Sequence, residues 1–304
     1  MSEKEKELYF VLVCAWWLVM SIQNLAIAAN PSLILDAKNI DNLPRGFRSS
    51  ANLLPADLNK TGFVELRMSG SGQFSALELA KMLSKLPTTK ITIVDLRQES
   101  HGFADGYAIS WYSQYNGNNL GKTPTQVELD QNTRLTVLSK QRRIIVNSLA
   151  KKLLSPNIIT FIPKIMLIRK VTSEIDLLKS FLPNWQLEYK RFYITDHYAP
   201  SVRDLNNLVK FIKSLPQNSW VHFHCRAGKG RTTAFMVSYD IIRNAKHVSL
   251  AQILKRQAIG GKDLRIMPPK DSHKYLQAQI RLKIIRKFYQ YCKNNNDNFT
   301  TIFT

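Results

Sequence analysis

The order of the apolar segments predicts an α/β protein, in which a central sheet is flanked by helices. Three segments carry this prediction. Residues 90–96 (KITIVDL) form a short apolar run that is typical of a buried strand. Residues 201–215 have apolar side chains at helical spacing, and Ser201 is suited to cap their first turn. Residues 221–233 (VHFHCRAGKGRTT) begin with strand-like alternation, pass through a loop with two glycines and enter an apolar helix.

The other elements follow from the same patterns. Helical spacing predicts helices at residues 75–86, 250–259 and 276–291, and residues 157–171 and 186–195 are β-like. Residues 68–74 (MSGSGQF) are small and polar, which favours a turn, and residues 44–50 have the composition of a loop. Residues 125–154 are harder to assign, because helix-compatible apolar spacing is combined with a basic run at 140–143.

Composition restricts the partners that can be considered. The 304-residue chain carries a formal net charge of +21 and has a pI near 9.9. Such a charge attracts polyanions, which include nucleic acid, anionic membranes and heavily phosphorylated small molecules. The sequence has no zinc-finger spacing, no aromatic platform motif for nucleic acid and no HExxH motif. We therefore expect neither a nucleic-acid partner nor a metal site.

The N-terminal segment suggests export. Residues 8–22 are apolar and are followed by a small-residue stretch at 26–29, as in a secretory signal peptide cleaved near residue 28 or 29. The acidic start of the chain fits this less well, so an uncleaved anchor or an internal helix stays open. The domain is expected to span residues 30–304. We expect a periplasmic or secreted protein, with delivery into a host cell as the alternative. The three cysteines suggest no disulfide.

The loop between residues 225 and 231 has the features of a phosphate cradle. Backbone N–H groups and the start of a helix favour an anion there, and Gly228 and Gly230 permit the backbone angles that such a loop needs. The same field favours a thiolate at Cys225, which would make it a nucleophile. Arg231 can hold two phosphate oxygens with its planar guanidinium. A buried structural cysteine is the alternative.

An alkoxide leaving group needs a proton donor. Asp196 lies at the end of a predicted strand, upstream of Cys225, and is the candidate general acid. A turn aspartate is the alternative interpretation of Asp196. Asp204 is the nearest rival, but it falls within a predicted helix.

The string HCRAGKGRTT resembles the signature loop of the protein tyrosine phosphatase superfamily, HCxxGxxR[ST]. The segments LPRGFRSS, SGSGQFS, DLRQESHGF, ITDH and HFHCRAGKGRTTAFMV resemble, in this order, the bacterial protein tyrosine phosphatase-like phytases. The resemblance implies a phosphatase-like core, a small β-rich subdomain drawn from segments before residue 190, and stepwise dephosphorylation of myo-inositol hexakisphosphate without a metal or cofactor. The mature form would have no stable membrane span.

The resemblance also assigns roles by position. Cys225 would be the nucleophile and Asp196 the acid, Thr232 would assist the departing thiolate, and His224 would orient the loop. The expected substrate-binding residues are Arg226, Ala227, Gly228, Lys229 and Gly230 in the loop, with Arg48, His197, Lys270 and Lys274 outside it. Each of these cations has a plain alternative as a solvated surface charge.

Two departures from the family pattern affect these expectations. Tyr115 and Asn116 stand where a histidine–aspartate pair is expected, and the loop at 262–270 is shorter than in the family. The alternative functions are a phosphoinositide lipid phosphatase, which would also contact anionic lipid headgroups, a phosphotyrosine phosphatase and a non-enzymatic polyanion binder.

Overall fold

The computed structural model describes residues 31–152 and 155–304. The predicted signal peptide, residues 1–29, and Cys14 lie outside these residues. Cys225 and Cys292 are both free thiols. Among the residues described, no helix has both the length and the apolar character that a membrane crossing requires.

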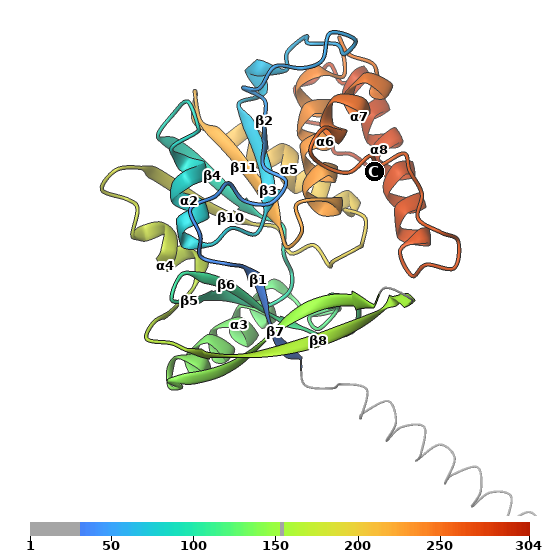
Figure 1. The fold of residues 1–304 in the computed structure, drawn as a ribbon. Coiled ribbons are helices and arrows are strands. Elements are labelled where there is room, and N and C mark those ends of the chain that lie inside the picture. Colours follow the sequence, from blue (N-terminus) through green and yellow to red (C-terminus); the bar gives the residue numbers. More distant parts are fainter. Residues whose placement is uncertain (1–30, 153–154) are drawn as a thin grey trace, which may run out of the picture.

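The central sheet has five strands in the order β10-β4-β11-β3-β2 (Figure 1). Its strands are β2 (Arg48–Ser49), β3 (Met68–Gly72), β4 (Lys90–Asp95), β10 (Gln186–Arg191) and β11 (Trp220–Cys225). β11 pairs in parallel with both β3 and β4, whereas β2 is antiparallel to β3. β11 is therefore the central strand, and its carboxyl end leads directly into the signature loop at Cys225.

Helices cover both faces of this sheet (Figure 1). One face packs on α5 (Val202–Ser214) and α6 (Gly230–Asn244), with α7 (Leu250–Ala258) and α8 (Tyr275–Asn294) outside them. The other face packs on α2 (Ala76–Leu83) and α4 (Glu174–Lys179). Ser75 and Ser201 each cap a helix through a capping box, which confirms the predicted N-cap at Ser201. A 3₁₀ turn, η1 (Val64–Leu66), precedes β3.

A second sheet has six strands in the order β8-β7-β1-β6-β5-β9. The strands are β1 (Ser32–Ala37), β5 (His101–Ala104), β6 (Tyr107–Tyr112), β7 (Arg143–Lys152), β8 (Ser155–Leu167) and β9 (Val171–Thr172). Helix α3 (Pro124–Ser139) packs on one face through Leu135 and Leu138. The 3₁₀ turn η2 (Gln114–Asn116) leads from β6 toward α3.

One prediction of local structure was wrong. Residues 68–72 form the buried strand β3 and not a turn. A Cβ at Gly70 would lie 2.5 Å from Met236 Sδ and 2.9 Å from Thr232 Cγ2, so the small residues let α6 approach the sheet. Residues 125–154 divide at Ser139, where α3 ends, and β7 begins at Arg143. Residues 140–142 of the basic run form the turn between them, and Arg143 begins β7.

Candidate active site

The loop after β11 is held in shape by its glycines and by β3. Gly228 has φ +71°, and a Cβ there would lie 2.3 Å from the backbone nitrogen of Gly72. Gly230 begins α6, so the helix N-terminus faces the loop. Cys225, the last residue of β11, is 2% exposed. The structure thus places the sulfur at the base of a loop directed by a helix N-terminus.

Cys225 lies near one hydroxyl and three cations. The Thr232 hydroxyl donates to Cys225 Sγ at 3.1 Å. The guanidinium groups of Arg48, Arg231 and Arg281 lie close enough to Cys225 to interact with it electrostatically. Hydrogen-bond donors and cations of this kind suit a loop that binds an anion.

Arg231 is almost fully buried and lies between two carboxylates. It donates to Glu99 through two parallel hydrogen bonds, Nη1 to Oε2 at 2.7 Å and Nη2 to Oε1 at 2.9 Å. Asp196 Oδ1 lies 3.2 Å from Nη2. The fork–fork geometry with Glu99 fixes the plane of the guanidinium before any phosphate binds. Glu99 was not identified from the sequence, although it lies in the polar loop that follows β4.

Asp196 lies next to Arg231 on the loop that leads to α5. Its Oδ2 accepts a hydrogen bond from Asn116 Nδ2 at 3.0 Å. Burial would raise the pKa of Asp196, but the charge of Arg231 outweighs it and lowers the pKa below its usual value. The structure therefore brings together the predicted nucleophile, arginine and acid. It also gives Asn116, noted only as a departure from the family, a direct contact with that acid.

His197 follows Asp196 with φ +69°. Burial, opposed by Asp196, lowers the pKa of His197 to about 4, so its ring is neutral near pH 7. The ring of His197 contacts His273 at 5.2 Å between centroids, and His273 stacks on Tyr115 at 3.9 Å. These rings join the loop after β6 to the loop before α8 beside the acid.

Cations gather around the same loops. Burial lowers the pKa of Lys262, and the charges of Arg281, Lys274 and Lys229 lower it further. We call these four residues the rim cations. Arg281 Nη2 also donates to the carbonyl of His197 at 2.7 Å. Of the two C-terminal lysines predicted to bind substrate, Lys274 thus belongs to the rim, whereas Lys270 is exposed in the preceding loop.

Two other predicted substrate contacts are engaged with the protein. Arg48 is 6% exposed and donates to the carbonyl of Gly228 and to Thr233 Oγ1, both at 3.0 Å. Burial lowers the pKa of Arg48 to about 10. Arg226 Nε donates to Asp36 Oδ1 at 2.8 Å. Arg48 of β2 therefore binds the loop directly, and Arg226 anchors the loop to Asp36 of β1. Ala227 and Lys229 are exposed on the loop itself.

Below the loop, charges alternate in sign. Asp36 joins Arg226 to Arg97, with 2.9 Å between Arg97 Nη1 and Asp36 Oδ2. Arg97 Nε donates to Glu99 Oε1 at 2.9 Å, and Glu99 binds Arg231. We call these five residues the floor network. It connects β1, in the six-stranded sheet, to Arg231 of the loop after β11.

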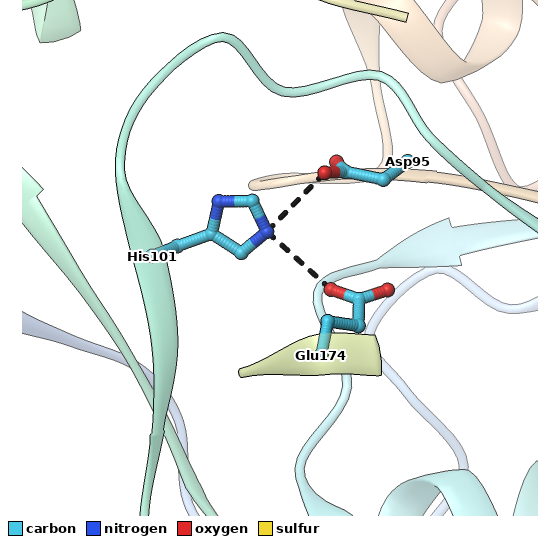
Figure 2. A group of neighbouring side chains, drawn as sticks. All are labelled: Asp95, His101 and Glu174. Carbon is cyan, nitrogen blue, oxygen red and sulfur yellow. Dashed lines mark ion pairs between the residues drawn. The ribbon is translucent and has the colours of Figure 1, made fainter. Parts of the chain in front are cut away.

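A second buried cluster joins Asp95, His101 and Glu174 (Figure 2), and Glu174 also contacts His224. His101 Nε2 is 3.3 Å from Asp95 Oδ2 and 3.4 Å from Glu174 Oε2. Burial would lower the pKa of His101, but Asp95 raises it, so a protonated ring lies between the two carboxylates. His224 Nε2 is 2.7 Å from Glu174 Oε1. Burial would raise the pKa of Glu174, and the His224 ring lowers it to about 2.

The contacts of this cluster explain its role. The three residues His101, Asp95 and Glu174 are close enough to hold a cation. Asp95 also binds Arg191 Nε at 3.1 Å and accepts from the Tyr189 hydroxyl at 2.9 Å. The His101 imidazolium and Arg191 already supply positive charge to the carboxylates, and the Tyr189 hydroxyl adds a hydrogen bond. The donor set therefore fits an ion-pair cluster that orients His224 beside Cys225 better than it fits a metal site.

Comparisons with known proteins agree with this geometry. A family model for PTP-like phytases, described by the words inositol hexakisphosphate, matches residues 94–243. The PTP-like myo-inositol phosphatase of Mitsuokella multacida, solved with myo-inositol-(1,3,4,5)-tetrakisphosphate, is 31% identical. The structures align with a TM-score of 0.82 over 90% of this chain and 47% of that one. The PTP-like phytase of Bdellovibrio bacteriovorus is 26% identical, with a TM-score of 0.70 over 90% of this chain and 93% of that one.

A curated relative is the effector protein hopD2 of Pseudomonas syringae pv. tomato. It is 26% identical over 272 residues, which are 85% of this chain and 55% of that protein. The chain thus spans about half the length of this relative and of the Mitsuokella protein. The fold, the signature loop and the region matched by the family model all indicate the same family. The chain belongs to the PTP-like phytase family.

Proposed function

We propose that the protein hydrolyses phosphate monoesters of myo-inositol hexakisphosphate and of lower inositol polyphosphates. The observation that supports this most directly is the convergence of four groups. Cys225 accepts a hydrogen bond from Thr232 at 3.1 Å, and Arg231 lies 3.2 Å from Asp196. A nucleophile, an anion-binding fork and a proton donor thus meet at one loop, as phosphate-ester cleavage requires.

The reaction would take two steps. In the first, Cys225 Sγ attacks phosphorus and forms a sulfur–phosphorus bond while the bond to the leaving oxygen breaks. Asp196 gives that oxygen its proton, and the inositol phosphate with one phosphate fewer leaves as an alcohol. In the second, Asp196 takes a proton from water, whose oxygen attacks the phosphocysteine and releases inorganic phosphate. The Thr232 hydroxyl stabilises the sulfur anion that departs.

The rim cations support a substrate with several phosphates. One phosphate needs the loop amides and Arg231, whereas the rim adds four further cations, of which Arg281 interacts with Asp196. Neighbouring phosphates on one inositol ring would reach them. The Mitsuokella protein, whose structure contains an inositol tetrakisphosphate, supports the same class of substrate. A phosphoinositide lipid carries the same headgroup chemistry and is the second candidate substrate. Of the two expected locations, the similarity to the effector protein hopD2 supports delivery into a host cell, the alternative to a periplasmic or secreted protein.

The decisive experiment measures phosphate release from inositol hexakisphosphate with a chelator present and with the product isomers resolved. We expect turnover to continue, because Cys225, Arg231 and Asp196 supply the nucleophile, the charge and the proton. Cys225→Ser should lower turnover by at least about 10⁴-fold and keep measurable substrate binding. Turnover by Cys225→Ser at the wild-type rate would contradict the proposal. Release from phosphoinositide vesicles but not from the soluble substrate would favour the lipid.

A further inference from the structure

The region around β7 and β8 has an unusual distribution of charge. From residue 131 to residue 173 the chain contains no Asp or Glu and nine Lys or Arg residues. They are Arg134, Lys140, Arg142, Arg143, Lys151, Lys152, Lys164, Arg169 and Lys170. Among those whose side chains the structure describes, all except the half-buried Arg134 are exposed. This part of the molecule is therefore uniformly positive over a long stretch of sequence.

The same hairpin exposes apolar side chains on one face. Ile145 pairs with Ile165 across the two strands, and these residues are 60% and 61% exposed. Leu167 is 73% exposed, and Phe161 is 39% exposed. The alternating residue Ile144 points to the opposite face, where it is 3% exposed in the core under α3. We call Ile145, Phe161, Ile165 and Leu167 the apolar ladder.

The apolar ladder lies on the side of the six-stranded sheet that faces the loop after β11. Ile34 of β1 pairs with Asn147 of β7, and paired residues share a face. Phe161 contacts the Tyr112 ring at 6.2 Å between centroids, and Arg226 of the catalytic loop lies 5.1 Å above Tyr112. Figure 1 shows the hairpin along the lower edge of the molecule, with β8 outermost. The exposed face thus continues from the catalytic loop to the sheet edge.

We propose that the apolar ladder and the cations around it dock on an anionic lipid bilayer. Aliphatic side chains enter the boundary between headgroups and acyl chains, and flanking Lys and Arg residues bind the negative surface. A second copy of this chain would bring two positive surfaces together, which costs electrostatic energy. Single-stranded nucleic acid prefers stacking aromatic side chains, whereas the ladder is mainly aliphatic. Net charge and side-chain type therefore both favour the bilayer.

Co-sedimentation of the full chain with vesicles tests this proposal. We expect binding to phosphatidylcholine vesicles that contain phosphatidylserine, little binding to phosphatidylcholine alone, and release at high salt. The triple variant Ile145→Thr/Ile165→Thr/Leu167→Thr keeps residues suited to a strand and should bind about tenfold more weakly. In the double variant Arg142→Gln/Arg143→Gln, the affinity for the anionic vesicles should fall about fivefold for each cation removed. Residues 8–22 are apolar and are present in every variant, so the comparison uses the part of the binding that requires phosphatidylserine and is lost at high salt.

A matched control lies on the same strand. Ile162 is 52% exposed on the other face of β8, so Ile162→Thr should bind like the wild type, whereas Ile165→Thr should bind more weakly. Equal binding by the wild type and the triple variant would overturn the proposal. A dimer that the triple variant loses in analytical ultracentrifugation, with no vesicle binding, would overturn it in favour of self-association. Release of phosphate from soluble inositol hexakisphosphate is measured separately, so failure of docking and failure of the proposed activity are distinguishable.

Discussion

The floor network and the rim cations differ in the charges of their neighbours. In the floor network each arginine lies within 3 Å of a carboxylate, and Asp36, Arg97 and Glu99 are completely buried. At the rim the cations lie near one another, and burial together with their mutual repulsion lowers the pKa of Lys262. The floor is electrostatically complete before any ligand arrives. A polyanionic ligand would add opposite charge at the rim, so the two regions should respond differently to substitution.

The largest effect is expected at Asp196, where the two regions meet. Asp196→Asn removes the proton donor and should slow hydrolysis of alkyl phosphates by about 10²–10⁴-fold. Phenyl phosphates should lose far less, because their leaving groups need little protonation. The comparison of kcat/KM for the two ester classes checks this. Equal losses for both classes would contradict the role of Asp196 as the acid.

Glu99→Gln should break the floor network. It leaves Arg231 with Asp196 and Arg97 with Asp36 as their remaining carboxylates in a buried site. Removal of one member of a buried ion pair typically costs about 3–5 kcal/mol of unfolding free energy. Chemical denaturation measures this loss, and phosphate release should fall as Arg231 loses its fixed orientation. Lys262→Gln at the rim is the matched control, and its stability should equal or exceed that of the wild type. A Glu99→Gln protein as stable as the wild type would remove the distinction between floor and rim.

Substitution at the rim should change binding more than stability. Lys262→Gln and Lys274→Gln should each raise KM for inositol hexakisphosphate several-fold, and the double variant should show a weaker dependence of KM on salt. For a substrate with one phosphate, such as phenyl phosphate, KM should change little. The same rise in KM for both substrates would show that the rim does not distinguish polyphosphates.

The smallest effect is a shift in pH dependence at Asn116. Asp196 must be protonated to act as the acid, and its pKa in the free protein is lowered, so kcat/KM should fall as pH rises through that pKa. Asn116→Asp replaces a hydrogen-bond donor to Asp196 with a carboxyl group, which raises the pKa of Asp196. The decline should move to higher pH by about one unit. A pH profile that matches the wild type would mean that the contact seen at 3.0 Å does not tune the acid.

Much of the fold could be predicted because β4, α5 and the strand–loop–helix at Cys225 have strong local patterns. Strand β3 could not, since its small residues serve contacts with α6 that are distant in sequence. In the site, Cys225 and Arg231 follow from local spacing. Glu99 and Asp36 do not, because nothing near them in sequence shows that they face arginines of another strand or loop.

The contact between Arg226 and Asp36 joins residues 190 positions apart. The catalytic loop therefore takes its final shape only after one of the earliest strands to be synthesised has met one of the late loops, and this long separation slows assembly. A fragment that begins after β1 would keep the whole signature motif but lose the anchor of its loop. Cutting between the two sheets would therefore remove a contact that holds the loop after β11 in place.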